Sequence, residues 1–295
     1  MNFDNELKNQ IEIINDIIEK YLPHKAEFQK RLVQAMNYSM LAGGKRIRPM
    51  LMLQTYRMFG GKSAIIEPFM AAMEMIHTHS LVHDDLPSID NDEYRRGQKT
   101  THMEYGEAMA VLAGDGLLNY AYETVSRAFA MEPENLNIGV SINILAKKTG
   151  VYGMLGGQSV DVESAGQAIE KEQLLFIYRL KTGALIEASM MIGAALSGAS
   201  GEEVKQIETI ASDIGLAFQI QDDILDVTGT AGILGKPVKS DEKNLKTTYV
   251  TLTGLKEAKK EVEMLSNRAI AGLDALSARN EFLRELIIQL INREK

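Results

Sequence analysis

The sequence contains no cysteine among its 295 residues and no long uninterrupted apolar run. The lack of cysteine excludes disulfide bonds, thiolate zinc sites and cysteine nucleophiles, and it fits a reducing compartment. No apolar stretch approaches the ~20 residues that a helix needs to cross a bilayer. Residues 1–6 carry acids where a secretory signal would carry bases. We therefore expect a soluble, cytoplasmic protein.

Basic residues are also in deficit. The 32 lysines and arginines are outnumbered by 40 aspartates and glutamates, which gives a formal net charge of −8. Such a field repels nucleic acid and anionic membrane surfaces, so we expect neither a nucleic-acid partner nor a stable association with membranes. An anionic ligand would have to bind at a local cluster of cations.

Proline and strand-like patterns are rare, whereas helical periodicity runs through almost the whole chain. The six prolines fall mostly near expected helix ends, as at Pro49 and Pro87. Apolar residues recur at helical spacing, and 45% of the residues are hydrophobic, enough for a large core. We predict an all-α fold, with residues 1–295 as a single domain, because no linker or shift in composition divides the chain.

The helical pattern can be divided at its prolines, glycines and polar breaks. The segment 185–196 is apolar on nearly every face, which is typical of a helix in the middle of a bundle or at a subunit contact. The expected helices cover residues 3–20, 25–42, 47–59, 64–86, 104–130, 136–155, 170–198, 202–227, 242–253, 256–275 and 279–292.

Two acid-rich stretches, residues 84–93 and 221–226, each end an apolar segment. Crowded carboxylates repel one another and resist desolvation, so two such clusters inside a folded body indicate cations between them. Oxygen ligands favour Mg²⁺, which proteins commonly use to bind phosphate groups. The pair of clusters therefore points to a magnesium-dependent phosphate site. Solvated acidic surface is the alternative for either cluster taken alone.

The first cluster lies where a helix must end. Pro87 disfavours helical conformation at Leu86, so Asp84 and Asp85 should lie in the last helical turn. The segment that follows can fold Asp90 back toward Asp84. Carboxylates in a last turn oppose the helix dipole, which favours a bound cation there.

The second cluster forms a stripe on one helix. Gln219, Asp222, Asp223 and Asp226 are spaced i, i+3, i+4, i+7 and so share a face. A stripe of three acids on an otherwise apolar helix needs partners. Together with the first cluster, it is best explained by a shared group of metal ions.

Cationic groups alternate with these clusters along the chain, at residues 43–49, 95–97, 181–183 and 235–239. The first contains a glycine pair followed by three cations, a turn suited to a diphosphate. Arginine binds phosphate oxygens bidentately, and lysine adds a mobile point charge. On an ideal helix His77 shares a face with Asp84, so it can point into the same cavity while lying too far away to bind the metal.

These motifs, in this order, resemble those of the trans-isoprenyl diphosphate synthases across essentially the whole chain. Asp84, Asp85 and Asp90, followed by Arg95-Arg96-Gly97, are similar to the first aspartate-rich motif of that family in its bacterial form. Residues 221–226 are similar to the second. The resemblance implies an all-α bundle of the isoprenoid synthase type with a central cavity, and a homodimer.

The resemblance also implies roles for individual residues. Three Mg²⁺ ions would bridge the diphosphate of an allylic substrate, which ionises and is attacked by the alkene of isopentenyl diphosphate. Proton loss, to the departing diphosphate, would complete the reaction. The metal ligands would be Asp84, Asp90 and Asp222, supported by Asp85 and Asp226; the allylic diphosphate would be bound by Arg95, Lys181 and Lys236, isopentenyl diphosphate by Lys45, Arg48, His77 and Arg96, and the carbocation by Thr182 and Gln219.

Product length in that family depends on residues just before the first motif. Bacterial farnesyl synthases tend to place an aromatic ring five positions ahead of it, and here that position is His79, followed by Ser80. A ring of intermediate size can still close the cavity after two additions. We therefore expect farnesyl diphosphate, with geranylgeranyl diphosphate as the alternative product.

Three other functions compete with this interpretation. A helical metal phosphohydrolase, indicated by His83-Asp84, would need histidines from distant helices. A terpene cyclase would have no need of the cationic turn at residues 43–48. A non-catalytic Ca²⁺-binding or scaffold protein is disfavoured because the stretch from Asp84 has neither an oxygen ligand at Leu86 nor the glycine of an EF-hand at Ile89.

Overall fold

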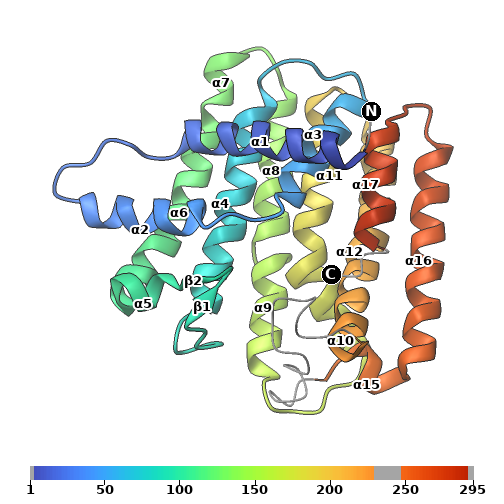
Figure 1. Cartoon of the computed structure of the whole chain (residues 1–295). Helices are drawn as coiled ribbons and strands as arrows, with labels where there is room; N and C mark the ends of the chain where they lie inside the picture. Colours follow the sequence, from blue (N-terminus) through green and yellow to red (C-terminus); the bar gives the residue numbers. More distant parts are fainter. Residues whose placement is uncertain (1–2, 229–246, 292–295) are drawn as a thin grey trace. The chain divides into compact units, whose positions relative to one another are not determined.

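The computed structural model describes residues 3–228 and 247–291, and almost all of its regular structure is helical (Figure 1). The all-α prediction is confirmed. The chain divides into two compact units, one comprising Met1–Leu53 and Lys62–Ile142, the other Gln54–Gly61 and Asn143–Lys295. In the part of the chain that is described, no helix is long and apolar enough to span a membrane.

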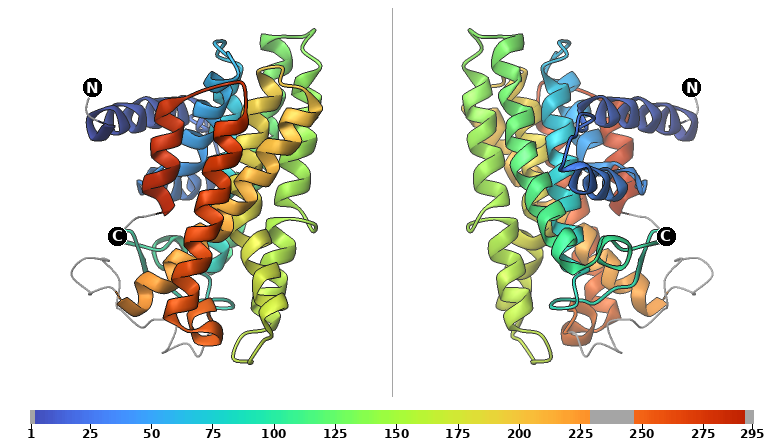
Figure 2. Two further views of the ribbon diagram at one scale, coloured as in Figure 1. Left: turned by 90° about the vertical axis from the view of Figure 1, so that its right-hand side faces the viewer. Right: turned by 90° about the vertical axis from the view of Figure 1, so that its left-hand side faces the viewer.

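The first unit is built around α4, whose residues 68–76 are all buried. This helix packs against α6, α1 and α2 (Figures 1 and 2). Its apolar and small side chains leave no polar face in the middle of the helix. The elements that begin here are α1 (Phe3–Tyr21), α2 (Lys30–Leu41), α3 (Ile47–Met58), α4 (Ile66–Asp84), β1 (Tyr94–Arg95), β2 (Gln98–Lys99), α5 (Thr101–Tyr105), α6 (Glu107–Ser126), α7 (Ala128–Met131) and α8 (Asn137–Thr149).

The second unit contains a fully buried helix, α11. All thirteen of its residues are buried, as expected for the apolar segment 185–196, and it packs against α12. On its other side α12 packs against α16, and Arg268 of α16 donates two hydrogen bonds to Asp213 of α12. Its elements are α9 (Met154–Glu163), α10 (Lys171–Ile177), the π-helical turn η1 (Tyr178–Gly183), α11 (Ala184–Leu196), α12 (Gly201–Thr228), α15 (Tyr249–Thr253), α16 (Leu255–Ala275) and α17 (Glu281–Ile291).

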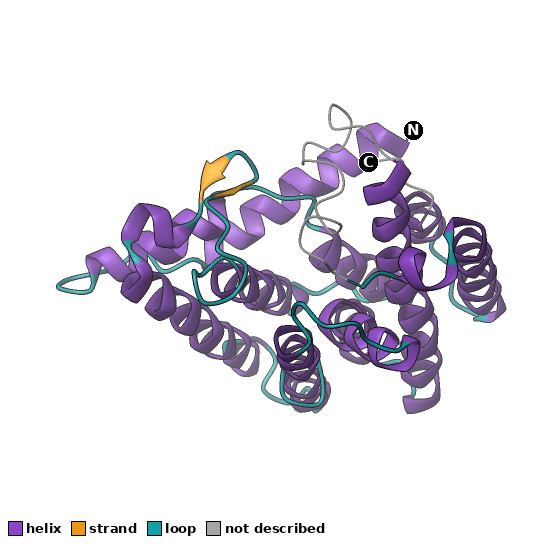
Figure 3. Ribbon diagram, turned by 90° about the horizontal axis from the view of Figure 1, so that it is seen from below, coloured by secondary structure: helices purple, strands orange, loops and turns teal. Residues whose placement is uncertain are grey.

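Several helix boundaries differ from those expected. The helix predicted over 104–130 is three helices, because Gly106 adopts a positive φ of 87° and the chain turns again at Arg127. Residues 25–29 lie outside α2. The helix predicted over 136–155 ends at Thr149, and a separate helix, α9, follows at Met154–Glu163, most of which was not predicted. The continuous helix predicted over 170–198 contains η1. A two-stranded hairpin, not expected at all, is visible in Figure 3.

Candidate active site

The first acidic cluster lies where α4 ends. The backbone N–H of Asp85 still donates to the carbonyl of Leu81 at 3.0 Å, and the chain then reverses so that the N–H of Asp90 donates to the carbonyl of Asp84 at 2.9 Å. The predicted return of Asp90 toward Asp84 is confirmed. Asp84 is half-buried and Asp90 is exposed, so carboxylate oxygens from both sides of the turn are accessible to a cation.

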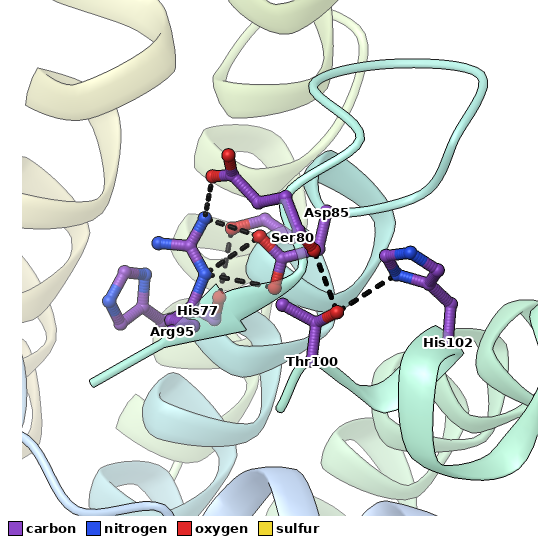
Figure 4. A network of polar contacts seen from close by, with 7 residues as sticks. His77, Ser80, Asp85, Arg95, Thr100 and His102 are labelled. Carbon is purple, nitrogen blue, oxygen red and sulfur yellow. Dashed lines mark hydrogen bonds and ion pairs between the residues drawn. The ribbon is translucent and has the colours of Figure 1, made fainter. Parts of the chain in front are cut away.

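Asp85 serves a different purpose from its neighbour, because it is buried and paired with Arg95. The Arg95 Nε atom lies 2.8 and 2.9 Å from the two carboxylate oxygens (Figure 4). Burial raises the pKa of the Asp85 carboxyl, although Arg95 opposes the shift. The pair holds the hairpin that carries Arg95 against the end of α4, and the Arg95 side chain stays 29% exposed.

A second contact fixes the other strand of this hairpin. The hydroxyl of Thr100 donates to the carbonyl of Asp92 at 2.7 Å, and the Nδ1 atom of buried His102 lies 3.0 Å from the same hydroxyl (Figure 4). Because a hydroxyl has a single proton, it can only accept from His102, which assigns the proton of that ring to Nδ1. The loop between Asp85 and α5 is therefore anchored at both ends.

The glycine turn before α3 is in contact with the side chain of Arg96. Gly43 and Gly44 both have positive φ angles, 81° and 145°, and Arg96 donates a hydrogen bond to the carbonyl of Gly43. A Cβ atom on Gly44 would lie 2.8 Å from the Arg96 guanidinium, so glycine allows this close approach. Lys45, next in the turn, is exposed.

Arg46, the second of the three cations that follow the glycine pair, binds to the protein interior. Its guanidinium is buried and donates to Glu74 at 2.7 Å, to Asn15 at 2.9 Å and to the carbonyl of Met40 at 2.9 Å. Three helices are joined by this one side chain. Arg46 is therefore a structural cation.

Arg48 and His77 are in contact in the first unit, and the pKa values of both side chains are strongly lowered. Arg48 Nη1 lies 3.3 Å from His77 Nε2. Burial lowers the pKa of His77 well below its usual range, and the positive charge of Arg48 adds to the shift; burial also lowers the pKa of Arg48 to about 10. A guanidinium has only donors, so Nε2 is the acceptor of a neutral ring. Two side chains expected to bind isopentenyl diphosphate are thus in contact.

Lys181 and Thr182 lie in the π-helical turn η1, a type of local structure found often at functional sites. The Thr182 hydroxyl donates to Gln219 Oε1 at 2.8 Å, which brings together the two groups expected to face a carbocation. A Cβ on Gly157 of α9 would lie 2.3 Å from the backbone nitrogen of Lys181. One on Gly215 of α12 would lie 2.8 Å from Gly183 Cα. Glycines on both neighbours therefore let α9 and α12 approach the turn.

The second acidic cluster divides by burial along the face of α12. Asp222 is exposed and Asp226 half-buried, whereas Asp223 is buried. Asp223 Oδ2 accepts from the Tyr178 hydroxyl at 2.6 Å and from the Tyr249 backbone N–H at 2.7 Å. It joins the start of η1 to the start of α15, so among these three aspartates Asp222 has the most accessible carboxylate.

Asp161 was not found from the sequence. Its Oδ2 atom lies 2.6 Å from Lys181 Nζ, and it is on α9, in a part of that helix that the sequence did not predict. The spacing of Gly157 and Asp161, four residues apart on one helical face, is the only signal the sequence carries. Lys236, expected to bind the allylic diphosphate, lies outside the described residues.

The two residues expected to limit product length lie on α4. His79 is buried, with Nδ1 3.0 Å from the carbonyl of Gly114 on α6, and its ring meets that of His83 edge-on at 4.6 Å. The Ser80 hydroxyl donates to the carbonyl of His77 at 2.8 Å. Ser80 is thus turned onto its own helix, while His79 reaches across to α6.

Within the described residues, no three histidine, aspartate or glutamate side chains are already grouped as a metal site. Proteins that bind Mg²⁺ through one or two carboxylates rely on substrate phosphates for the remaining ligands. The carboxylates of Asp84 and Asp90 in the first unit, and that of Asp222 in the second, are hard oxygen donors of the kind that this mode of binding uses.

All-α structure, two acidic clusters and interleaved arginines and lysines are the features expected of an enzyme that acts on diphosphates. The chain belongs to the polyprenyl synthetase family, and the sequence model of that family matches residues 29–280. It is 40% identical over 287 residues to a farnesyl diphosphate synthase of Geobacillus stearothermophilus, with 95% of each chain covered. It is 42% identical to a geranylgeranyl diphosphate synthase of Cyanophora paradoxa, covering 88% of this chain and 85% of the relative.

Solved structures agree with this assignment. A geranyltransferase from Helicobacter pylori, complexed with magnesium and isoprenyl diphosphate, superimposes with a TM-score of 0.85 at 33% identity, covering 99% of this chain and 97% of that one. An FPP/GFPP synthase from Zymomonas mobilis gives a TM-score of 0.86 at 32% identity, covering 98% and 99%. The expected family is confirmed.

Proposed function

We propose that this chain is a prenyltransferase that condenses isopentenyl diphosphate with dimethylallyl and then geranyl diphosphate, giving (E,E)-farnesyl diphosphate and diphosphate. The observation that carries the proposal is a cationic site separate from the two aspartate clusters. It is formed by Arg48 with His77 and by Arg96 on the glycine turn. A cyclase or a phosphohydrolase acting on one diphosphate has no use for it. Curated relatives with this activity are similar over nearly the full length.

Mg²⁺ is the proposed cofactor, in three ions bound by Asp84, Asp90 and Asp222 together with the allylic diphosphate. The support is the oxygen-only donor set and the magnesium complex of the Helicobacter pylori geranyltransferase. When bound, the ions neutralise charge on the leaving diphosphate. Asp85 positions Arg95, and Asp226 supports the cluster from the next turn of α12.

The remaining residues take the proposed roles that the resemblance to the family implies. Arg95, Lys181 and Lys236 bind the allylic diphosphate, while Lys45, Arg48, His77 and Arg96 bind isopentenyl diphosphate. Thr182 and Gln219 present oxygen dipoles to the developing carbocation. The surrounding apolar helices exclude water that would quench it. The final proton is proposed to leave with the departing diphosphate.

Geranylgeranyl diphosphate is the second candidate product. It is favoured by relatives of that name at comparable identity and by the absence of a phenyl ring at position 79. Farnesyl diphosphate remains the first choice, because the buried His79 ring is supported by both His83 and α6.

We further propose a homodimer in which residues 1–295 act as one catalytic domain. Exposed apolar side chains on the outer face of α6 and in α5 support such a contact, since exposed apolar patches mark interaction sites; they are Met103, Val111 and Leu112. The cytoplasmic location expected from the sequence stays a prediction.

The function is tested by diphosphate release. Release should require Mg²⁺ and both substrates, dimethylallyl and isopentenyl diphosphate. Equal release from the allylic substrate alone would instead indicate a cyclase or hydrolase. Asp84→Ala and Asp222→Ala should each lower turnover by ~10²-fold or more, because each removes a ligand that neutralises the leaving group, while circular dichroism stays that of the parent. Near-normal turnover of either variant would overturn the shared metal group.

A further inference from the structure

We propose that Asp161 is a positioning residue, which holds the Lys181 ammonium where the diphosphate of the allylic substrate binds. The inference rests on the proposed function, since it adds a residue to that same site. Lys181 Nζ lies 2.6 Å from Asp161 Oδ2. The two side chains are 26% and 28% exposed, so the pair is partly sheltered from water and still open to a ligand.

The contact is made by a helix that is itself fixed against the π-helical turn. Gly157, four residues before Asp161 on the same face of α9, lies against the backbone of Lys181, and a Cβ there would be 2.3 Å from its nitrogen. Backbone and ammonium of Lys181 are therefore both held by α9. On the next residue, Thr182 is held from α12 through Gln219. The geometry of this turn is set from two sides.

Such a contact should favour substrate binding rather than compete with it. A free lysine side chain samples many rotamers, and ordering it costs free energy at the moment of binding. Asp161 imposes that order before the substrate arrives. An ammonium has three donors, so a hydrogen bond to Asp161 and one to a phosphate oxygen can be made at the same time.

The test is a comparison of KM values with matched charge changes. Asp161→Asn keeps size and one acceptor oxygen but removes the charge. It should raise KM for dimethylallyl diphosphate by about tenfold, as expected for weakening one charge-assisted hydrogen bond, with KM for isopentenyl diphosphate and kcat changed by less than about threefold. Glu163→Gln, two residues further along α9 and exposed, changes net charge equally and should behave like the parent.

A double variant separates positioning from general damage. In a Lys181→Met background, Asp161→Asn should have no further effect on KM for the allylic substrate, because its partner is gone. An unchanged or lowered KM in the single variant, an equal rise for both substrates, or an undiminished effect in the Lys181→Met background would each overturn the proposal. Failure of the proposed function is a separate result, seen as a parent protein that does not condense the two substrates.

Discussion

His79 is held between two helices, and its environment makes it the best candidate for the residue that limits the product. Its ring Nδ1 lies within hydrogen-bond distance of the carbonyl oxygen of Gly114 on α6, and its ring packs against that of His83. If it closes the cavity, His79→Ala should remove that floor and shift the product from fifteen-carbon toward twenty-carbon chains, as seen by chromatography of the dephosphorylated products. His24→Ala, at an exposed histidine in the same unit, should leave the product unchanged. The same product from His79→Ala and the parent would exclude His79 from this role.

The same side chain predicts a pH dependence of stability. Burial lowers the pKa of His79 to about 4, with the His83 charge adding to the shift. The unfolded chain therefore binds a proton on this ring between pH 6.5 and 4 that the folded chain does not, so stability falls as pH falls through that range. Between about pH 7 and about pH 5 the contribution of His79 to the free energy of unfolding should drop by about 2 kcal/mol.

Urea denaturation of parent and His79→Gln measures this contribution. Glutamine can still donate to the carbonyl of Gly114 but does not titrate. The parent should lose more stability than the variant over that pH range, and parallel losses would contradict the assignment.

The buried pair of Arg46 and Glu74 carries a prediction about stability alone. Both side chains are 3% exposed. Arg46→Met should destabilise the protein by ~3–5 kcal/mol, because it leaves the Glu74 carboxylate buried without a partner. Adding Glu74→Leu should recover most of that loss in urea denaturation. A double variant no more stable than the single one would show that Arg46 acts mainly through Asn15 and the Met40 carbonyl.

Among the elements, the π-helical turn depends on the absence of a side chain at Gly157. Gly157→Ala would place a Cβ 2.3 Å from a backbone nitrogen, and backbone cannot move aside as a flexible side chain can. We expect a loss of ~1–3 kcal/mol in the free energy of unfolding and a fall in activity as Lys181 moves. Gly139→Ala in α8 is the control, since nothing lies within 4 Å of its Cβ position. Equal stability of the two variants would contradict the close contact.

The sequence predicted those features of these elements that depend on neighbouring residues. It did not predict those that depend on contacts between residues far apart in the sequence. The end of α4 and the return of Asp90 follow from Pro87, a local constraint, and both were predicted. The π-helical turn was not predicted, and its close contacts with Gly157 of α9 and Gly215 of α12 are made only in the folded structure. Asp85 and Asp223 were read as members of acidic clusters, and only the folded structure shows them as anchors for Arg95 and for Tyr178.

For the whole molecule, the two acidic clusters belong to different compact units of the chain, residues 84–93 to the first and 221–226 to the second. Their order along the sequence, with cationic groups between them, was sufficient to predict the family, and the helical periodicity of apolar residues was sufficient to predict the all-α class. The partners that tune each side chain were beyond such a prediction. Burial, and after it the positive charge of Arg48, lowers the pKa of His77, and Arg46 is structural because of Glu74. No local pattern in the sequence encodes these surroundings.

The most direct test of the account is the product formed from dimethylallyl and isopentenyl diphosphates with Mg²⁺, identified by chromatography after dephosphorylation. The account predicts (E,E)-farnesol as the main product, with geraniol as a transient, and no product without isopentenyl diphosphate or Mg²⁺. Cyclic terpenes, or the unextended dimethylallyl alcohol alone, would contradict the assignment of chain elongation to this site.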